Sequence, residues 1–406
     1  MAVNLEPPKN LLPVSGVRLG TAMAGIRKFG RRDLCLIELA EGSRAAGVFT
    51  RNAFCAAPVT VARRHLQSGT GPRALLINTG SANAGTGQEG IRNAQSCCQY
   101  LATALQCSPE AVLPFSTGVI AEHLKVARVE TAAPLLVEAL EEDGWALAAE
   151  AIMTTDTVPK AVSRQCELNG KTVTVTGIAK GAGMIRPDMA TMLAFIATDA
   201  GLSQADLQTC LNDAVNSSFN CITVDGDTST NDACILIATG QAGTGEIDSS
   251  HPDYVSLKSA VHEVCTLLAQ AIIRDGEGAT RFVTIEVLDA STDREARAVA
   301  DTIAHSPLVK TALFAGDPNW GRILAAVGRS PVEKLDLSRV GMWLDDVRLV
   351  QGGEIDPDYR EEEAAAVVAR PEFCIRVSLG RGQGAAKLWT CDFSYDYVRI
   401  NAEYRS

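Results

Sequence analysis

The segment with the most distinctive chemistry runs from Lys180 to Ile196. A glycine-rich stretch follows Lys180, and the chain then passes through Pro187 into an apolar run of strand length that begins at Thr191. A threonine hydroxyl can attack the carbonyl of the preceding residue, here Ala190, if that peptide is strained and an oxyanion site is ready. The Ala190-Thr191 bond is therefore a candidate for self-cleavage.

Cleavage at this bond would leave a free α-amine on Thr191. Such an amine has an unperturbed pKa of about 7.7–8.0 and can activate the hydroxyl of its own residue without a histidine. The scarcity of histidine, of which the chain has 5, suits this solution. Spacing alone nevertheless favours the plainer interpretation, which is a glycine turn followed by an ordinary core strand.

The elements that must position this segment alternate between strand-like and helix-like patterns. This alternation predicts a mixed α/β fold in which helices cover sheets. Strands are predicted at Leu34–Glu38, Ala74–Asn78, Thr172–Thr176, Thr191–Thr198, Ala233–Ala238 and Arg281–Leu288, and helices at Gly90–Cys107, Lys125–Glu142, Ser203–Ser218 and Asp253–Arg274. Asn169-Gly170 predicts a hairpin turn. Shorter elements and more polar loops beyond about residue 290 predict a smaller C-terminal domain.

Composition limits the classes of partner. The formal net charge of -11 argues against binding to nucleic acid or to an anionic membrane, and 46% hydrophobic residues allow a sizeable core. The N-terminus lacks a signal-peptide pattern, and no apolar run is long enough to span a bilayer, so we expect a cytoplasmic protein. The 12 cysteines contain no C-x-x-C pair and the histidines have no metal-ligand spacing, so we expect neither a disulfide framework nor a metal site.

A glycine pattern at Gly85, Gly87 and Gly90 formally fits a dinucleotide-binding fingerprint. The pattern begins seven positions after Asn78 at the end of the preceding strand, which is too far for the tight first turn of that fold. No clear acidic partner at a strand end follows about 20 residues further on, so we assign no nucleotide cofactor.

The segment that begins at Asp225 resembles a calcium-binding loop at first sight. It has Thr230 where such a loop needs glycine and Leu236 where it needs a bidentate glutamate. A polar turn is the better interpretation.

Lys180–Thr191 closely resembles the cleavage signature of the ornithine acetyltransferase family, commonly written K-G-[SA]-G-M-I-x-P-N-M-A-T-M-L. Further stretches resemble the family in the same order along the chain: Phe49–Asn52, Asn78–Gly87, Ser116–Ile120, Met153–Thr157, Thr223–Asp232, Arg274–Thr280, Gly316–Arg322 and Ile400–Ser406. The resemblance covers essentially the whole chain. Asp188 departs from the usual asparagine and could alter the rate of cleavage, but it removes no reacting group.

The resemblance implies roles for individual residues. Thr191 corresponds to the family's cleavage residue and catalytic nucleophile, and it also contacts substrate. Thr117 and Gly118 correspond to the oxyanion hole, in which a hydroxyl and a backbone N–H stabilise developing negative charge.

Five further residues correspond to substrate-contacting positions of the family: Thr154, Lys180, Glu277, Asn401 and Ser406. Their types suit an acetylated amino acid. A lysine can pair with the α-carboxylate, and a glutamate can bind an amine or exchange a proton near the leaving nitrogen. Asn401 and Ser406 would add polar contacts from a C-terminal tail folded over the pocket.

The implied reaction is a ping-pong transfer in arginine biosynthesis. Acetyl passes from N-acetylornithine to the Thr191 hydroxyl and then to glutamate, with no cofactor, and many family members also accept acetyl-CoA as a co-substrate. The implied fold is the layered sheet-and-helix sandwich of N-terminal-nucleophile enzymes. We expect a catalytic domain at 1–285, a smaller domain at 286–406, an α chain of 1–190, a β chain of 191–406, and an (αβ)2 heterotetramer.

Two alternatives remain open. An N-terminal-nucleophile aminopeptidase or amidohydrolase of similar fold would share self-cleavage and the oxyanion hole, but water would accept the acyl group. A non-catalytic amino-acid-binding protein would keep an intact chain and bind ligand without turnover.

Overall fold

A computed structural model describes residues 2–186 and 192–403 of the chain. These residues form two compact units. The larger unit comprises Pro7–Asn220 and Asp227–Ile272, and the smaller comprises Met1–Glu6, Cys221–Gly226 and Ile273–Ser406. No helix in the described ranges combines the length and the apolar character that crossing a membrane requires.

The larger unit is built on two principal sheets. The first has the order β1 (Val17–Ala22), β2 (Leu34–Leu39), β4 (Ala74–Ser81), β5 (Val112–Val119), and the second has the order β3 (Arg44–Phe49), β11 (Ala233–Ala238), β8 (Leu193–Thr198), β7 (Lys171–Lys180), β6 (Lys160–Leu168). Two neighbouring strand pairs in these sheets are parallel, β4 with β5 and β8 with β11. The short strands β9 (Gly201–Leu202) and β12 (Glu246–Ile247) form a separate pair.

The two sheets pack face to face around an apolar core. The ring of Phe115 in β5 meets the ring of Phe195 in β8 edge to face at 5.0 Å between centroids. The helices of this unit are α1 (Ala57–Gln67), α2 (Gly87–Leu105), α3 (Val126–Glu138), α4 (Trp145–Ala151), α5 (Gln204–Ser217) and α6 (Tyr254–Arg274), with short 3-10 turns at Pro109–Ala111 and Phe219–Cys221.

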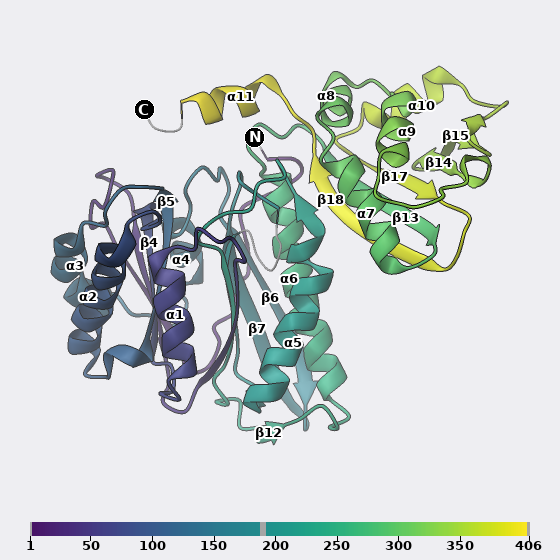
Figure 1. The fold of residues 1–406 in the computed structure, drawn as a ribbon. Helices are drawn as coiled ribbons and strands as arrows, with labels where there is room; N and C mark the ends of the chain where they lie inside the picture. Colours follow the sequence, from purple (N-terminus) through teal and green to yellow (C-terminus); the bar gives the residue numbers. More distant parts are fainter. Residues whose placement is uncertain (1, 187–191, 404–406) are drawn as a thin grey trace. The chain divides into compact units, whose positions relative to one another are not determined.

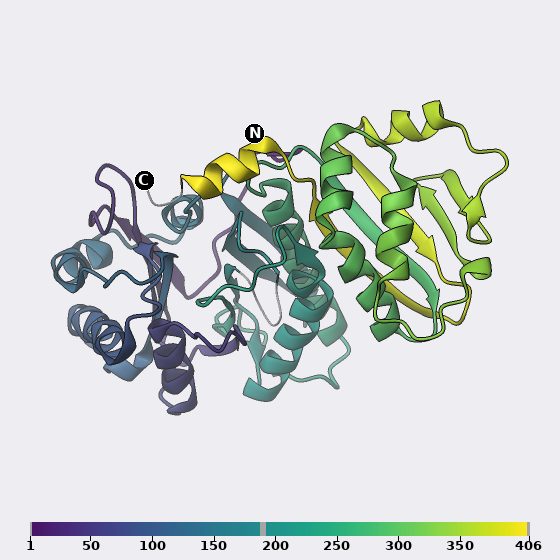
Figure 2. The same ribbon diagram turned by 45° about the horizontal axis from the view of Figure 1, so that its top comes forward.

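The helices complete a layered sandwich. Helices α2 and α3 cover the outer face of the four-stranded sheet, while α5 and α6 lie on the five-stranded sheet (Figure 1). Helices α1 and α4 contribute side chains to the core between the sheets. Figure 2 shows the same ribbon from a tilted view. The predicted α/β sandwich is therefore confirmed.

The smaller unit has a mixed seven-stranded sheet. Its order is β10 (Ile222–Thr223), β18 (Gly384–Cys391), β13 (Phe282–Ala290), β17 (Glu372–Ser378), β14 (Gly341–Leu344), β15 (Val347–Gln351), β16 (Glu354–Ile355). Its helices are α7 (Asp293–Ala304), α8 (Pro307–Ala315), α9 (Trp320–Gly328), α10 (Glu361–Val368) and α11 (Tyr395–Ala402), with a 3-10 turn at Leu337–Arg339. A separate apolar core joins this sheet to α7, α8, α9 and α10.

The main division between the units lies between Ile272 and Ile273, earlier in the chain than the boundary that we expected at 285/286. That boundary falls inside β13, whose residues pair with β17 and β18 over its whole length. The smaller unit therefore starts at Ile273 and also takes in two segments from earlier in the chain. One of them, β10, pairs with β18, and no local pattern could reveal such a long-range pairing.

Most predicted elements of the larger unit are present, with shifted ends. The helix predicted over Lys125–Glu142 ends at Glu138, because Glu141 forms an isolated β-bridge with Leu19. The Asn169-Gly170 turn joins β6 and β7 in register as predicted. The helix predicted over Ser203–Ser218 is α5, and the structure adds that the Ser203 side chain caps it.

Candidate active site

Thr117 and Gly118 lie at the carboxyl end of β5, beside the end of β4. Buried polar side chains fix these strand ends. The Ser116 hydroxyl donates to Asn78 Oδ1 at 2.6 Å, and the Asn231 amide donates to the Ser116 carbonyl. A preorganised donor is what an oxyanion hole requires, because it pays little reorganisation cost when charge develops.

Gly118 occupies a position that accepts only glycine. Its φ is 134°, and a Cβ there would lie 2.4 Å from the carbonyl carbon of Gly80. The register between β4 and β5 shifts at Gly80 and Ser81, so the two backbones approach closely at this point. The turn at the end of β5 therefore depends on glycine for both backbone conformation and space.

Lys180 ends β7 and is buried, with 9% of its surface exposed. Its Nζ donates to Thr117 Oγ1 at 3.4 Å, which is long for a hydrogen bond. Because lysine is donor-only, the Thr117 hydroxyl acts as acceptor in this contact and keeps its own hydrogen for another acceptor. The structure therefore brings together two predicted site residues from different sheets.

Asp156 is the charged centre of this cluster. Its Oδ1 accepts from Lys160 Nζ and from the backbone N–H of Gly181, both at 2.7 Å, and its Oδ2 accepts from the Thr154 N–H at 2.9 Å. Thr154, a predicted substrate contact, is half-buried in the loop between α4 and β6. Asp156 thus fixes the backbone at both Thr154 and the residue after Lys180.

The charges around Asp156 determine its ionisation. Burial alone would raise its pKa, but the positive charges of Lys160 and Lys180, with the hydrogen bonds, outweigh burial and hold the pKa of Asp156 well below its ordinary value. The carboxylate is therefore ionised at neutral pH and balances two buried lysines.

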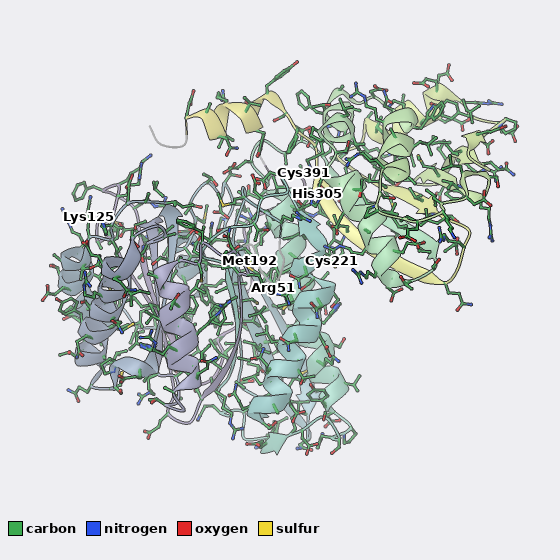
Figure 3. All side chains as sticks on the ribbon, viewed as in Figure 1. Arg51, Lys125, Met192, Cys221, His305 and Cys391 are labelled. Carbon is green, nitrogen blue, oxygen red and sulfur yellow. The ribbon has the colours of Figure 1, made fainter. Side chains whose placement is uncertain are left out.

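Ala190, Thr191 and Ser406, which were predicted as the cleavage pair and a substrate contact, lie outside the described residues, as does Asp188. Met192 is the first described residue after Thr191 and is labelled in Figure 3. The backbone carbonyl of Met192 accepts from the N–H of Ala233 at 2.9 Å.

In the smaller unit, Glu277 and Asn401 are paired. Glu277 is buried, with 6% exposed, and its Oε2 accepts from Asn401 Nδ2 at 2.8 Å. Glu277 lies in the loop after α6, and Asn401 lies near the end of α11. A carboxylate buried with an amide partner suits recognition of an amine.

Gly278 allows α11 to approach the Glu277 loop. Its φ is 69°, and a Cβ there would lie 2.4 Å from the backbone nitrogen of Tyr397. The Ser394 hydroxyl, which caps α11, donates to the Gly278 carbonyl at 2.6 Å. The loop and the helix are therefore held together next to the Glu277–Asn401 pair.

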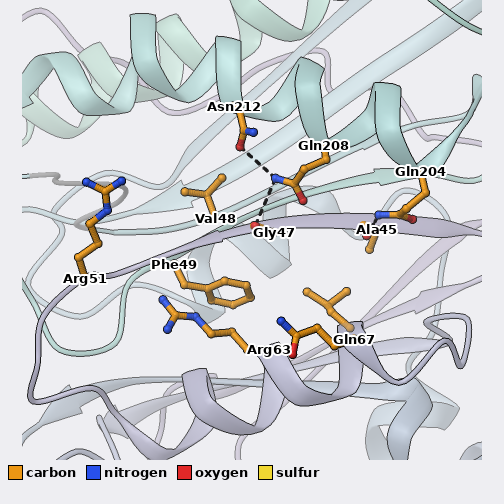
Figure 4. Close-up of a pocket in the computed structure, with 11 residues that line it drawn as sticks. Ala45, Gly47, Val48, Phe49, Arg51, Arg63, Gln67, Gln204, Gln208 and Asn212 are labelled. Atoms are coloured by element: carbon orange, nitrogen blue, oxygen red, sulfur yellow. Dashed lines mark hydrogen bonds between the residues drawn. The ribbon is translucent and has the colours of Figure 1, made fainter.

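A cavity of about 560 Å³ opens over β3, the edge strand of the five-stranded sheet, between α1 and α5 (Figure 4). Gln204 and Gln208 of α5 donate to the carbonyls of Ala45 and Gly47 at 3.0 and 3.4 Å. These contacts cap an edge that could otherwise pair with another strand. Of the predicted site residues that the structure describes, none lines this cavity.

Comparison with known proteins identifies the family. The ArgJ family model matches residues 18–406. The arginine biosynthesis bifunctional protein ArgJ of Methylococcus capsulatus is 57% identical over 396 residues, which make up 98% of this chain and 97% of the relative. The chain belongs to the ArgJ family. The resemblance to ornithine acetyltransferases inferred from the motifs is therefore confirmed.

Solved structures of ArgJ-family proteins match about half of this chain. ArgJ from Bacillus halodurans is 42% identical with a TM-score of 0.50, and the match covers 52% of this chain and 98% of that one. The ornithine acetyltransferase of Mycobacterium tuberculosis, solved in complex with ornithine, is 34% identical with a TM-score of 0.39 over 44% of this chain and 94% of that one.

Sequence reasoning did not single out two buried carboxyl groups, those of Asp156 and Asp232. Asp156 lies within the family motif Met153–Thr157, and Asp232 ends the motif Thr223–Asp232. The two motifs marked these segments as similar to the family, but only the fold places both carboxyl groups where the charge of Lys180 acts on them.

Proposed function

We propose that this chain is a self-cleaving acetyltransferase that moves acetyl from N-acetylornithine to glutamate through an acetyl ester on Thr191. Membership of the ArgJ family over nearly the whole chain carries this proposal. The cluster of Thr117, Lys180 and Asp156 supports it, because it supplies a hydroxyl donor and a buried cation within one polar site.

Self-cleavage between Ala190 and Thr191 would produce pieces of 190 and 216 residues. The larger piece is 216 of 406 residues, or about 53% of the chain. The Bacillus halodurans chain, matched over 98% of its length, corresponds to 52% of this chain. A solved chain of half length is consistent with a family whose members are cut near the middle.

The first half-reaction loads the enzyme. The free amine of Thr191 takes the hydroxyl proton as Oγ attacks the acetyl carbonyl of N-acetylornithine. The resulting oxyanion accepts hydrogen bonds from the Thr117 hydroxyl and the Gly118 N–H. The C–N bond then breaks, the departing nitrogen takes a proton, and ornithine leaves an acetyl ester on Thr191.

The second half-reaction transfers acetyl to the acceptor. The neutral amine of glutamate attacks the ester carbonyl, the same oxyanion forms, and Thr191 Oγ departs with a proton. Lys180 pairs with the α-carboxylate of the substrate. Glu277 and Asn401 bind the amine side, while Thr154 and Ser406 add polar contacts.

Other features belong to the same proposal. Acetyl-CoA serves as an alternative acetyl donor, and the α and β chains assemble as an (αβ)2 heterotetramer. The enzyme works in the cytoplasm, where thiols stay reduced. All 12 cysteines are free, and burial raises the pKa of thiols such as Cys35 and Cys210 to about 12, which keeps them unreactive.

An acetyl-transfer assay tests the proposal. Purified protein is incubated with N-acetylornithine alone, and the mass of the 191–406 piece is measured before and after addition of glutamate. We expect an added acetyl group that disappears as N-acetylglutamate forms. Release of ornithine and acetate without N-acetylglutamate would instead assign an amidohydrolase, and absence of turnover would favour a binding protein.

A further inference from the structure

Asp232 directly precedes β11, at the end of the five-stranded sheet where β7 ends and β8 begins. Lys180 of β7 is the register partner of Leu193 of β8, and Leu193 is the register partner of Ala233 of β11. These three residues lie side by side on adjacent strands. The residue before β11 is therefore next to the start of β8, and β8 begins two residues after Thr191 in the sequence.

The Asp232 carboxyl is buried without a full set of partners. Its residue is 4% exposed, and Oδ2 has no hydrogen-bond partner among the described residues. Thr230 Oγ1, two residues earlier, is likewise buried and lacks a partner in the described ranges. Buried polar atoms are nearly always paired in folded proteins, so two such atoms in one turn need an explanation, and a role in chemistry is one.

The surroundings of Asp232 favour a protonated carboxyl. Burial raises its pKa well above the ordinary value, and hydrogen bonds from Ser229 and the positive charge of Lys180 oppose this only in part. A neutral carboxylic acid can donate a proton, unlike the ionised carboxylate of Asp156 nearby.

A second buried aspartate on the same sheet provides a contrast. Asp199 follows β8 at its opposite end, is 5% exposed, and burial likewise raises its pKa. Its Oδ1 accepts from the backbone N–H of Thr174 at 2.9 Å, so it has the structural role expected of an aspartate at a strand end. Asp232 shares the burial, but its Oδ2 has no such partner within the described part of the chain.

We propose that Asp232 is the proton-transfer residue of self-cleavage, giving its carboxyl proton to the nitrogen of Thr191 as that nitrogen leaves the Ala190 carbonyl. This inference rests on the proposed function. The bond from Thr191 Oγ to the Ala190 carbonyl carbon forms, and the bond from that carbon to the Thr191 nitrogen breaks. The carboxyl gives one proton to the nitrogen and regains the proton that the hydroxyl loses. The shift from amide to ester therefore leaves Asp232 protonated, and water then hydrolyses the ester.

The test follows cleavage of freshly synthesised full-length chain by intact mass over time. Asp232→Asn keeps the shape of the side chain but cannot deliver an acidic proton, so we expect cleavage to slow by about 10²- to 10⁴-fold, the usual contribution of a positioned acid. Asp232→Glu should restore part of the rate. Asp199→Asn is the matched control and should cleave within about threefold of wild type, an order-of-magnitude limit for a residue outside the chemistry.

Hydroxylamine distinguishes the step affected, because it cleaves esters rapidly and leaves ordinary amides intact. If Asp232 acts in the acyl shift, no ester accumulates in Asp232→Asn and hydroxylamine does not restore cleavage. Release of the two pieces by hydroxylamine from this variant would overturn the assignment to that step.

The remaining outcomes are decisive in different ways. A folded Asp232→Asn that cleaves like wild type overturns this proposal alone. Equal loss of cleavage in Asp199→Asn, with matching loss of thermal stability in both variants, assigns Asp232 a structural role and also overturns it. An uncut wild-type chain overturns the proposed function and this inference together.

Discussion

At the scale of single residues, the site depends on how buried charges are balanced. Two lysines, Lys160 and Lys180, are buried in the larger unit, and Asp156 interacts with both. Leaving either charge unpaired in a low-dielectric site would be costly, so the three groups must be treated as one electrostatic unit. Replacing one member therefore affects stability and substrate binding together.

Asp156→Asn tests this balance through pH. Because the folded-state pKa of Asp156 is lowered, its stabilising effect is fully present above the unfolded-state pKa of about 3.9 and disappears as pH falls from there toward the folded-state pKa. We expect the variant to lose about 3–5 kcal/mol of stability at pH 7, the usual cost of breaking a buried pair. The difference from wild type should shrink below about pH 4, as measured by thermal unfolding.

Asp213→Asn is the control for this experiment, since Asp213 forms an ion pair with Lys258 on the exposed surface. The loss of folding stability in this variant should stay below about 1 kcal/mol and should show no comparable change at acidic pH. Equal effects for the two variants would contradict the electrostatic account.

Thr117→Ala tests the oxyanion hole. Removing one donor should lower kcat for acetyl transfer about 10²- to 10³-fold with little change in fold, because the backbone of β5 is unaffected. The change in kcat is measured by steady-state kinetics on the cleaved protein. Circular dichroism checks that the variant is folded. An unchanged kcat would exclude Thr117 from the reaction.

At the scale of elements, the contact between α11 and the Glu277 loop determines how the Glu277–Asn401 pair is held. Gly278→Ala would place a methyl group against the backbone of Tyr397 and push α11 away. We expect a raised KM for N-acetylornithine, since Asn401 would lose its alignment with Glu277.

Gly316→Ala is a matched control for Gly278→Ala. Gly316 has nearly the same φ, 67°, but a Cβ there would meet no atom of the described residues within 4 Å. Both variants carry the same backbone strain, so only the steric contact differs between them. If both variants raise KM equally, the strain explains the effect and the proposed role of the contact is wrong.

Element types were largely predictable, because apolar periodicity and turn residues are local signals. The hairpin at Asn169-Gly170 and the helix expected over Ser203–Ser218, found at Gln204–Ser217, are examples. The end of α3 was not predictable, since it depends on Glu141 pairing with Leu19 far away in the sequence. The site residues came from family motifs, and the position of Asp232 beside β8 required the strand register, which no local pattern encodes.

At the scale of the whole chain, the five-stranded sheet interleaves the two pieces expected from cleavage. In the order β3, β11, β8, β7, β6, the second and third strands come from residues 191–406 and the other three from residues 1–190. Two strand interfaces, β3 with β11 and β8 with β7, therefore join the pieces through backbone hydrogen bonds.

The pieces should consequently stay together after cleavage. We expect them to co-elute in gel filtration under native conditions and to separate only in denaturant, because separation would break the sheet and its core. Elution of either piece alone from native protein would show that this sheet does not hold the cleaved chain together.

The intact mass of purified wild-type protein, measured beside Thr191→Ala, tests the central claim most directly. The uncut chain is 42.9 kDa, and scaling by residue number gives pieces of roughly 20 and roughly 23 kDa. We predict these two masses for wild type and one uncut mass for the variant. A single uncut mass in folded, active wild-type protein would show that Thr191 has no free amine and would contradict the mechanism.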